Sequence, residues 1–411
     1  MDPRTNPYAP GAGTPPPELA GRDEVIKEAA IALDRIRAGR AAKSRIFHGL
    51  RGVGKTVLLN RISQEAEARG IVTANMEAPE ERSLPALLAP SLRSALIRLD
   101  RAEGIKAGAG RAWRALAGFV SSLKVRFQDI EMGLDVRPER GLADSGDLEN
   151  DLGDLLATVG EAAAERKTAV VLFIDELQYV HGTQLAALIT ALHGASQKQL
   201  PVTLVAAGLP QLLGQTGKAK SYAERLFAFV SIDQLDKEAA TKALCVPAEK
   251  EGGVRFEPDA IAEILHQTQC YPYFLQEWGK HSWDVARASP IRLDDAMIAT
   301  ERAIAELDAG FFRVRFDRLT PVEKHYMRAM AELGPGPHRS GDVADLLGKK
   351  VNAVAPVRSK LISKGMVYSP AHGDTGFTVP LFDGFMKRII PTIGDGGATM
   401  WDRGRTTRDG P

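Results

Sequence analysis

The segment that most constrains this 411-residue chain lies near its N-terminus and reads Gly49-Leu50-Arg51-Gly52-Val53-Gly54-Lys55-Thr56. It has the form G-x-x-x-x-G-K-[ST], preceded by a short apolar run that ends at His48 and followed by a helical pattern over 56–69. In such a loop, small residues let successive backbone N–H groups turn toward phosphate oxygens, and the following helix adds its positive end. A chance glycine-rich turn is the alternative, but it would require neither the lysine nor the flanking elements. The segment therefore predicts a nucleotide-phosphate site.

Two side chains of this loop have specific expected roles. The Lys55 ammonium should reach the β- and γ-phosphates of ATP, and the Thr56 hydroxyl should bind Mg²⁺, the only further cofactor implied. The residues expected to contact the nucleotide from this loop are Gly49, Arg51, Gly52, Val53, Gly54, Lys55 and Thr56.

Two acids, Asp175 and Glu176, follow the most apolar run of the chain, 170–174. Ligands collect at the carboxyl ends of strands in open α/β sheets. We therefore expect Asp175 to hold Mg²⁺ and Glu176 to act as the catalytic base that polarises the attacking water. Two solvated acids at a strand end are the alternative. Beside a phosphate loop, the pair indicates hydrolysis of ATP to ADP and phosphate.

Composition limits the other classes of function. The chain has 53 Lys and Arg against 52 Asp and Glu, so its net charge of +1 does not by itself indicate a polyanion partner. It has no run of eighteen apolar residues, and its N-terminus lacks the basic-then-apolar pattern of a signal peptide, so we expect no membrane segment. Only Cys245 and Cys270 occur. This favours a reducing cytoplasm, with neither a disulfide framework nor a zinc site.

Alternation of short β-branched runs with helical patterns predicts an α/β fold, a parallel sheet with helices on both faces. The expected strands are 45–48, 71–76, 169–174, 202–207 and 227–232. An insertion over 104–146 has no predicted role, although the alternation over 125–136 suits a hairpin. The predicted units are a disordered arm (1–18), the ATPase domain (19–235), a helical lid (236–316), a C-terminal domain (317–393) and a disordered tail (394–411).

The chain also resembles the AAA+ superfamily of ATPases over about 18–308. Three segments carry the resemblance: Leu19-Ala20-Gly21-Arg22-Asp23-Glu24, Gly208-Leu209-Pro210-Gln211-Leu212 and Tyr271-Pro272-Tyr273-Phe274-Leu275-Gln276. They are similar to segments of ATPases related to replication initiators, transposition ATPases and STAND signalling ATPases. The resemblance implies that Gly21 and Arg22 lie near the adenine. Over 310–321 the chain further resembles a bacterial ATP-binding family with a C-terminal winged helix.

Three departures from the AAA+ pattern bear on hydrolysis. The fourth strand ends Ala206-Ala207-Gly208, without the usual polar sensor of the γ-phosphate, for which Gln211 is a weak substitute. No second-sensor arginine is evident in the lid, although Lys280 lies nearby. Arg225 precedes the fifth strand, where related proteins place an arginine finger, but an ion pair with Glu224 is equally compatible. We therefore expect slow hydrolysis, or hydrolysis that depends on a protein partner or a neighbouring subunit of a homo-oligomer.

The C-terminal zone resembles a winged helix-turn-helix. A capping-box pattern at Thr320 and Glu323 starts the first expected helix, and helices over 341–347 and 353–364 follow, the last of them ended by Gly365. Two short strands are then expected over 366–369 and 377–380. Residues 318–390 contain 11 Lys and Arg against 6 Asp and Glu. The expected contacts to duplex DNA are Lys349, Lys350, Asn352, Arg358, Lys360 and Lys364. Winged helices also serve as protein-contact modules, so this alternative stays open. The sequence thus predicts an ATP-dependent switch that acts through DNA, or a signalling or scaffolding ATPase that acts through a protein partner.

Overall fold

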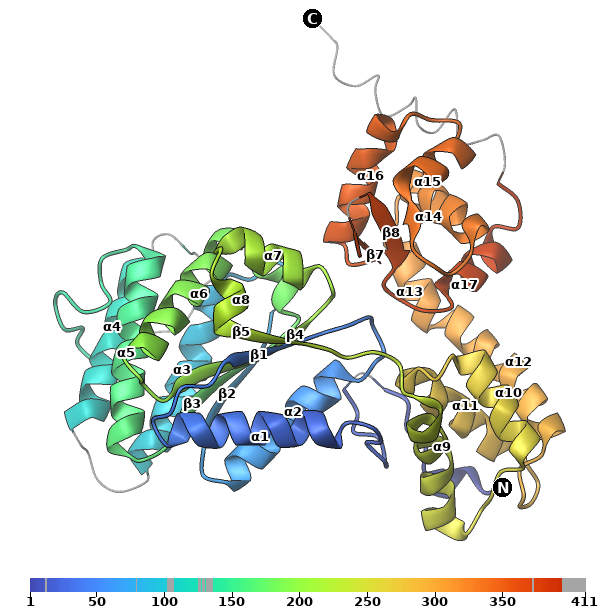
Figure 1. The fold of residues 1–411 in the computed structure, drawn as a ribbon, viewed down its shortest axis with the longest axis horizontal. Coiled ribbons are helices and arrows are strands. Elements are labelled where there is room, and N and C mark those ends of the chain that lie inside the picture. The colour runs from blue at the N-terminus through green and yellow to red at the C-terminus, as the bar shows by residue number, and fades with distance from the viewer. Residues whose placement is uncertain are drawn as a thin grey trace, which may run out of the picture.

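The computed structural model describes residues 1–11, 13–78, 80–101, 107–124, 127, 130, 136–371 and 373–393. Figure 1 shows a sheet domain, a bundle of helices beside it, and a C-terminal domain that contacts both. The predicted tail (394–411) and most of the hairpin predicted over 125–136 lie outside the described residues. In the part of the chain that the structure describes, no helix is both long enough and apolar enough to cross a membrane.

The central sheet confirms the predicted α/β fold. Its five parallel strands have the order β2 (Val72–Glu77), β3 (Val170–Asp175), β4 (Val202–Gly208), β1 (Ser44–His48) and β5 (Phe227–Ser231). The two ends of each predicted strand lie within one residue of the ends of an observed strand. All residues of β3 and β4 are buried, as expected for strands covered on both faces.

Helices cover both faces of the sheet (Figure 1). One face packs on α1 (Asp23–Arg37) and α2 (Lys55–Ala68), with Phe47 and Phe173 in that core. The other packs on α3 (Leu84–Arg101), α4 (Ala107–Leu123), α5 (Leu148–Glu165) and α6 (Gly182–Gln197). The alternation of β3 side chains between the two cores fixes its register. Three short helices complete the domain: η2 (Leu177–Tyr179), α7 (Leu212–Ala219) and α8 (Ala223–Leu226).

The lid is helical, as predicted. It comprises α9 (Lys237–Gly252), α10 (Pro258–Thr268), α11 (Pro272–Val285) and α12 (Leu293–Ala309). Trp278 is fully buried at the centre of the lid, and its indole N–H donates to Thr300 Oγ1 at 2.9 Å. A short helix, α13 (Phe311–Asp317), connects the lid to the C-terminal domain.

The C-terminal domain has the three predicted helices and the first predicted strand, but its second strand, observed over 374–377, was predicted three residues too late, over 377–380. Its helices are α14 (Pro321–Leu333), α15 (Ser340–Leu346), α16 (Val351–Ser363) and α17 (Phe382–Ile389), the last not predicted. Strand β6 (His338–Arg339), also not predicted, joins β7 (Val367–Tyr368) and β8 (Asp374–Phe377) in the antiparallel order β6-β8-β7. The predicted capping box at Thr320 and Glu323 is present.

The N-terminal arm is ordered against the lid, so the prediction of disorder was wrong for its described residues. Its first turn is η1 (Pro3–Thr5). Tyr8 is buried, donates to the Leu244 carbonyl and packs against Gly279, where any Cβ would collide with the tyrosine ring. The Trp283 indole N–H donates to the Asp2 carbonyl at 2.9 Å. Average composition does not predict the order of such an arm, because a few anchoring side chains are sufficient to hold it.

Candidate nucleotide-binding site

The phosphate loop connects the end of β1 to the start of α2, the context that the motif requires. Gly52 and Gly54 have φ values of 85° and 89°, which favour glycine. Gly49 permits a close approach, because a Cβ there would lie 2.0 Å from the Ile232 carbonyl oxygen. Lys55 and Thr56 are the first two residues of α2. The backbone of the loop and the positive end of α2 therefore face the same region.

Lys55 is 7% exposed, and its ammonium donates to the carbonyls of Gly49 at 3.0 Å and Leu50 at 2.8 Å. Burial lowers the pKa of Lys55 to about 8, although the negative charges of Glu176 and Asp175 oppose the shift. A buried cation with so little compensating charge favours an anionic ligand.

Thr56 and Asp175 lie in contact, as the predicted magnesium site requires. The Thr56 hydroxyl donates to Asp175 Oδ2 at 2.5 Å, and Asp175 Oδ1 accepts from the Glu176 backbone N–H at 2.8 Å. A hydroxyl and a carboxylate oxygen beside a phosphate loop are the hard oxygen ligands that suit Mg²⁺. These residues therefore fit the ion.

Glu176 lies at the same strand end, in the left-handed conformation with φ of 52°. Its carboxylate lies 3.6 Å from the Arg51 guanidinium and accepts from the Gln178 side-chain amide. These contacts hold the expected base beside the loop and also restrain it. Arg51 further donates to the Tyr179 hydroxyl at 2.8 Å.

Gln178 lies beside the end of the fourth strand, which lacks the usual polar sensor, and our sequence reasoning did not consider it. Its side-chain oxygen accepts from the Leu209 backbone N–H at 3.0 Å, just beyond the end of β4. Gln211, the residue considered for this place, instead directs its amide to the Ile362 carbonyl at 3.5 Å. The signal was available, because Gln178 is a polar residue two positions after the Asp175–Glu176 pair.

A cavity of about 480 Å³ lies beside the loop, within the range typical of small-molecule sites. It is lined by the loop, the lid, α13 and the N-terminal arm; the lining includes Lys55, Thr56, Tyr273, Gln276, Phe311, Arg315, Ala9, Pro10 and Thr14. Arg22 also lines it and donates to the Val53 and Asp233 carbonyls at 3.3 Å and 2.5 Å. Gly21 is outside the lining and packs against Ala239 of α9.

Arg315 of α13 is a second residue that the sequence analysis missed. Its guanidinium lies 4.0 Å from the Phe311 ring centroid and donates to the Phe311 carbonyl at 2.6 Å. Burial and the positive charge of Arg51 lower the pKa of Arg315 to about 10, and no carboxylate among the described residues forms an ion pair with it. Lys280, the cation considered for the lid, is instead paired with Glu306 at 2.8 Å. The clue in the sequence was a second arginine in this short helix, four residues after Phe311.

We expect Arg315→Ala to weaken ATP binding by roughly tenfold and ADP binding by less, since the lost cation lies toward Arg51 and Glu176. Arg313→Ala is the matched control, because Arg313 is exposed and pairs with Asp317 on the same helix. Calorimetric titration of both nucleotides into each variant provides the measurement. ATP affinities equal to that of the wild type would exclude Arg315 from the site.

Arg225 lies far from the loop of its own chain. It is exposed on α8, which leads into β5, and Phe227 of β5 pairs with Ser44 at the start of β1. The phosphate loop follows the other end of β1, at a distance of about 13 Å along the strand. The alternative ion pair with Glu224 does not form within the described residues. A catalytic role for Arg225 thus stays a prediction and would require a neighbouring subunit.

The C-terminal domain directly contacts the phosphate loop. The Arg51 backbone N–H donates to the Thr378 carbonyl at 2.9 Å. Gly365, which ends α16 with φ of 64° as predicted, lies so close that a Cβ would be 2.9 Å from the Tyr179 hydroxyl and 3.0 Å from Arg51 Nη2. The nucleotide site and the C-terminal domain therefore share residues at one interface.

Two of the six residues predicted to contact DNA are instead used within the C-terminal domain. Arg358 donates to Thr375 Oγ1 at 2.6 Å, to Ser369 Oγ at 2.7 Å and to the Asp374 carbonyl at 2.7 Å, which braces the predicted wing. Lys364 pairs with Glu323 at 2.7 Å. The prediction that these two bind DNA is corrected on this ground. The remaining four are exposed or half-buried near α16: Lys349, Lys350, Asn352 and Lys360.

Comparison with known families identifies the first part of the chain. Residues 18–205 match the family described as AAA ATPase domain, so the chain carries an AAA+ ATPase domain of the phosphate-loop type. Residues 309–386 match a second family, described as Domain of unknown function (DUF8462). No curated protein matches the sequence.

Comparison with solved structures found matches at low sequence identity. The Aeropyrum pernix ORC2 protein, in ADPNP–ADP complexes, has a TM-score of 0.50 and 14% identity, over 93% of this chain and 98% of that one. The Aeropyrum pernix ORC1 protein in complex with DNA has a TM-score of 0.47 and 14% identity, over 94% of this chain and 95% of that one. The Thermotoga maritima RuvB Holliday junction branch migration motor has a TM-score of 0.42 and 16% identity, over 87% of this chain and 92% of that one. The match to ORC2 supports the AAA+ fold assignment.

Proposed function

We propose that this protein is an ATP-dependent switch. ATP and Mg²⁺ bind between the phosphate loop and the lid, hydrolysis is slow, and the nucleotide state sets the position of the C-terminal domain. The observation that carries the proposal is Arg51. Its backbone holds the C-terminal domain through Thr378, and its side chain lies 3.6 Å from the expected base, Glu176.

The roles of the site residues follow from their positions. Lys55 would bind phosphate oxygens in exchange for the two loop carbonyls that it now contacts. Thr56 and Asp175 would hold Mg²⁺, which when bound neutralises phosphate charge. Glu176 would accept a proton from the attacking water once it moves away from Arg51.

Coupling between the two ends of the molecule follows from the shared interface. A displacement of the C-terminal domain would change the constraint on Arg51 and, through Arg51, the freedom of Glu176. By reciprocity, a nucleotide that moves the loop must change the affinity of the C-terminal domain for its ligand. Arg51 contacts both the C-terminal domain and Glu176, and it therefore provides a physical path for this coupling.

Duplex DNA is the proposed ligand of the C-terminal domain, which we interpret as a winged helix. The C-terminal end of α16 faces the sheet domain, through Ile362 and Gln211, so its N-terminal end points away. Lys349, Lys350 and Asn352 lie at this free end, where a helix N-terminus favours phosphate. Lys360 lies on the exposed side of the same helix.

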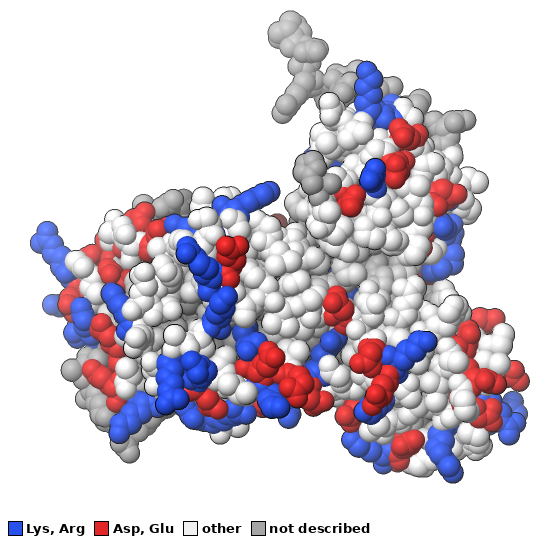
Figure 2. Space-filling model, viewed as in Figure 1, with Lys and Arg blue, Asp and Glu red and all other residues white. Residues whose placement is uncertain are grey.

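The alternative is a signalling or scaffolding ATPase whose C-terminal domain contacts protein. One observation favours it: with Arg358 turned inward, the exposed side of α16 carries uncharged residues between Lys350 and Lys360, including Ala355, Pro356 and Ser359. On the face drawn in Figure 2, positive and negative side chains are interspersed over the sheet domain and lid.

Salt-dependent binding of the full chain to duplex DNA separates the two proposals. Replacing Lys350 and Lys360 with Ala should weaken binding and reduce the slope of log K against log salt by about two, because each lost phosphate contact contributes about 0.9. Lys387→Ala, an exposed lysine of α17, is the control. ATP should change the affinity of the wild type. Absence of binding at low salt, with and without ATP, would leave the protein-contact alternative.

A further inference from the structure

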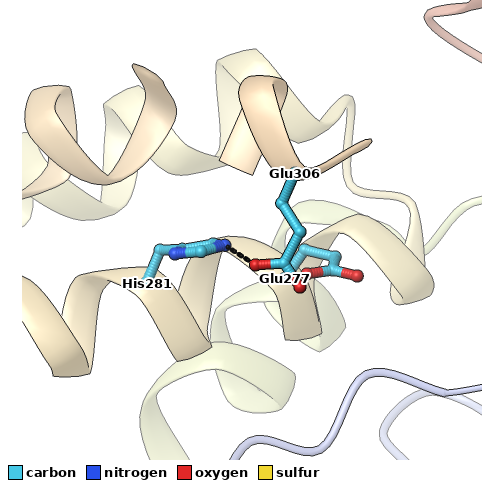
Figure 3. Close-up of side chains that lie close together, drawn as sticks. All are labelled: Glu277, His281 and Glu306. Carbon is cyan, nitrogen blue, oxygen red and sulfur yellow. Dashed lines mark ion pairs between the residues drawn. The ribbon is translucent and has the colours of Figure 1, made fainter. Parts of the chain in front are cut away.

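A group of three potential metal ligands lies in the lid, away from the phosphate loop (Figure 3). Glu277 and His281 are separated by one turn on the same side of α11, and Glu306 comes from the neighbouring helix α12. One ligand atom of each side chain lies within 4.8 Å of the other two. Ligands from two packed helices can therefore reach one ion.

Two of these side chains are buried, and each has one polar atom without a hydrogen bond. Glu277 is 4% exposed and His281 is 8% exposed, and neither Glu277 Oε2 nor His281 Nε2 makes a hydrogen bond. His281 Nε2 lies 3.1 Å from Glu306 Oε2, but the geometry does not satisfy a hydrogen bond. A buried carboxylate oxygen and a buried ring nitrogen that make no hydrogen bond are unusual in a folded protein.

We propose that Glu277, His281 and Glu306 bind a divalent transition metal ion, with Zn²⁺ the expected one. One imidazole and two carboxylates are donors that zinc accepts, and three protein ligands leave a fourth position for water. An imidazole ligand disfavours Mg²⁺ and Ca²⁺, which prefer oxygen, and the lack of a thiolate disfavours Cu(I). Glu306 is half exposed, so an ion can enter from solvent.

The surroundings contain a supporting group and a competitor. The Tyr273 hydroxyl donates to Glu277 Oε1 at 2.8 Å, which orients the carboxylate as outer-shell partners of metal ligands do. Lys280 donates to both oxygens of Glu306, at 2.8 Å and 3.0 Å. Its ammonium takes the positive position that the metal would occupy, so binding requires Lys280 to turn outward. Replacement of Lys280 therefore tests whether the three side chains form a metal site or only an ion-pair network.

Nothing in the amino-acid sequence indicated this site, because no close spacing joins the three residues. Glu306 lies on a different helix from the other two, and a Glu and a His separated by four residues are common on helix surfaces. The folded arrangement of α11 and α12 is needed to bring them together.

Zinc binding by the full chain, measured in competition with a chelating dye in Mg²⁺-free and nucleotide-free buffer, tests the proposal. We expect one Zn²⁺ per chain, and a loss of affinity of at least tenfold in His281→Ala and in the more exposed Glu306→Gln. Lys280→Ala should bind zinc roughly threefold more tightly or better, because it removes the competing charge. His266→Ala, an exposed histidine of α10, is the matched control.

Two further variants separate this site from the rest of the molecule. Lys55→Ala should bind zinc like the wild type, since the phosphate loop contributes no ligand. Replacing Cys245 and Cys270 with Ser should also leave the stoichiometry unchanged. Zinc binding that persists in His281→Ala and Glu306→Gln, or an absence of binding by the wild type at about 10 μM zinc, would overturn the proposal.

Discussion

Glu176→Gln is expected to reduce ATP turnover by roughly a hundredfold while ATP still binds. The amide preserves the size of the side chain but cannot take a proton from water as a carboxylate does. It also removes the negative charge that lies 3.6 Å from Arg51, so the restraint on the loop should loosen and not tighten. Steady-state phosphate release, with nucleotide affinity measured separately, distinguishes lost chemistry from lost binding.

Glu161→Gln is the control for this change, because Glu161 is exposed on α5 and pairs only with Arg111. Wild-type turnover in Glu176→Gln would place the base elsewhere. If the wild type itself shows no turnover, even with DNA and at high protein concentration, the protein would be a nucleotide-gated switch that does not hydrolyse ATP.

Lys55→Ala should weaken ATP and ADP binding by at least tenfold, about 1.4 kcal/mol, because the phosphates lose a charge-assisted partner. Lys27→Ala, an exposed lysine of α1, provides the control. Equal binding curves for Lys55→Ala and the wild type would contradict the assignment of the site.

The same lysine gives the wild type a pH dependence. Its pKa is lowered to about 8, and bound phosphates must raise it because they stabilise the ammonium. Affinity should therefore be complete only well below pH 8 and fall as pH rises through that value, by about five- to tenfold between pH 7.5 and 9. In Lys55→Ala this decline should be absent.

The elements that carry a local signature were predictable from the sequence. The phosphate loop, the acids after β3 and the parallel strands follow from glycine placement, from one apolar run and from β-branched alternation. Gly365 was predicted as the end of a helix. Its second role, the close approach to Tyr179 and Arg51, depends on docking of the C-terminal domain and has no local signal.

The parts that were missed depend on contacts between distant segments. Arg315 enters the cavity only because α13 folds back toward the phosphate loop. Arg358 fits the pattern of an exposed cation on a recognition helix, yet its hydrogen bonds run to the strands behind it. The N-terminal arm was misjudged because proline and glycine content predicts disorder, whereas a few side-chain contacts, among them that of the buried Tyr8, hold it against the lid.

Hydrogen exchange of the full chain, with and without Mg²⁺ and ATP, tests the proposed switch most directly. The Glu176→Gln variant would remain in the ATP-bound state. The Lys55→Ala variant would serve as the control that does not respond to ATP. We expect ATP to change amide exchange both in the phosphate loop, over 48–57, and in the C-terminal segment that contacts it, over 362–380. Changes confined to the phosphate loop and the lid, with 362–380 unaltered, would contradict coupling between nucleotide state and the C-terminal domain.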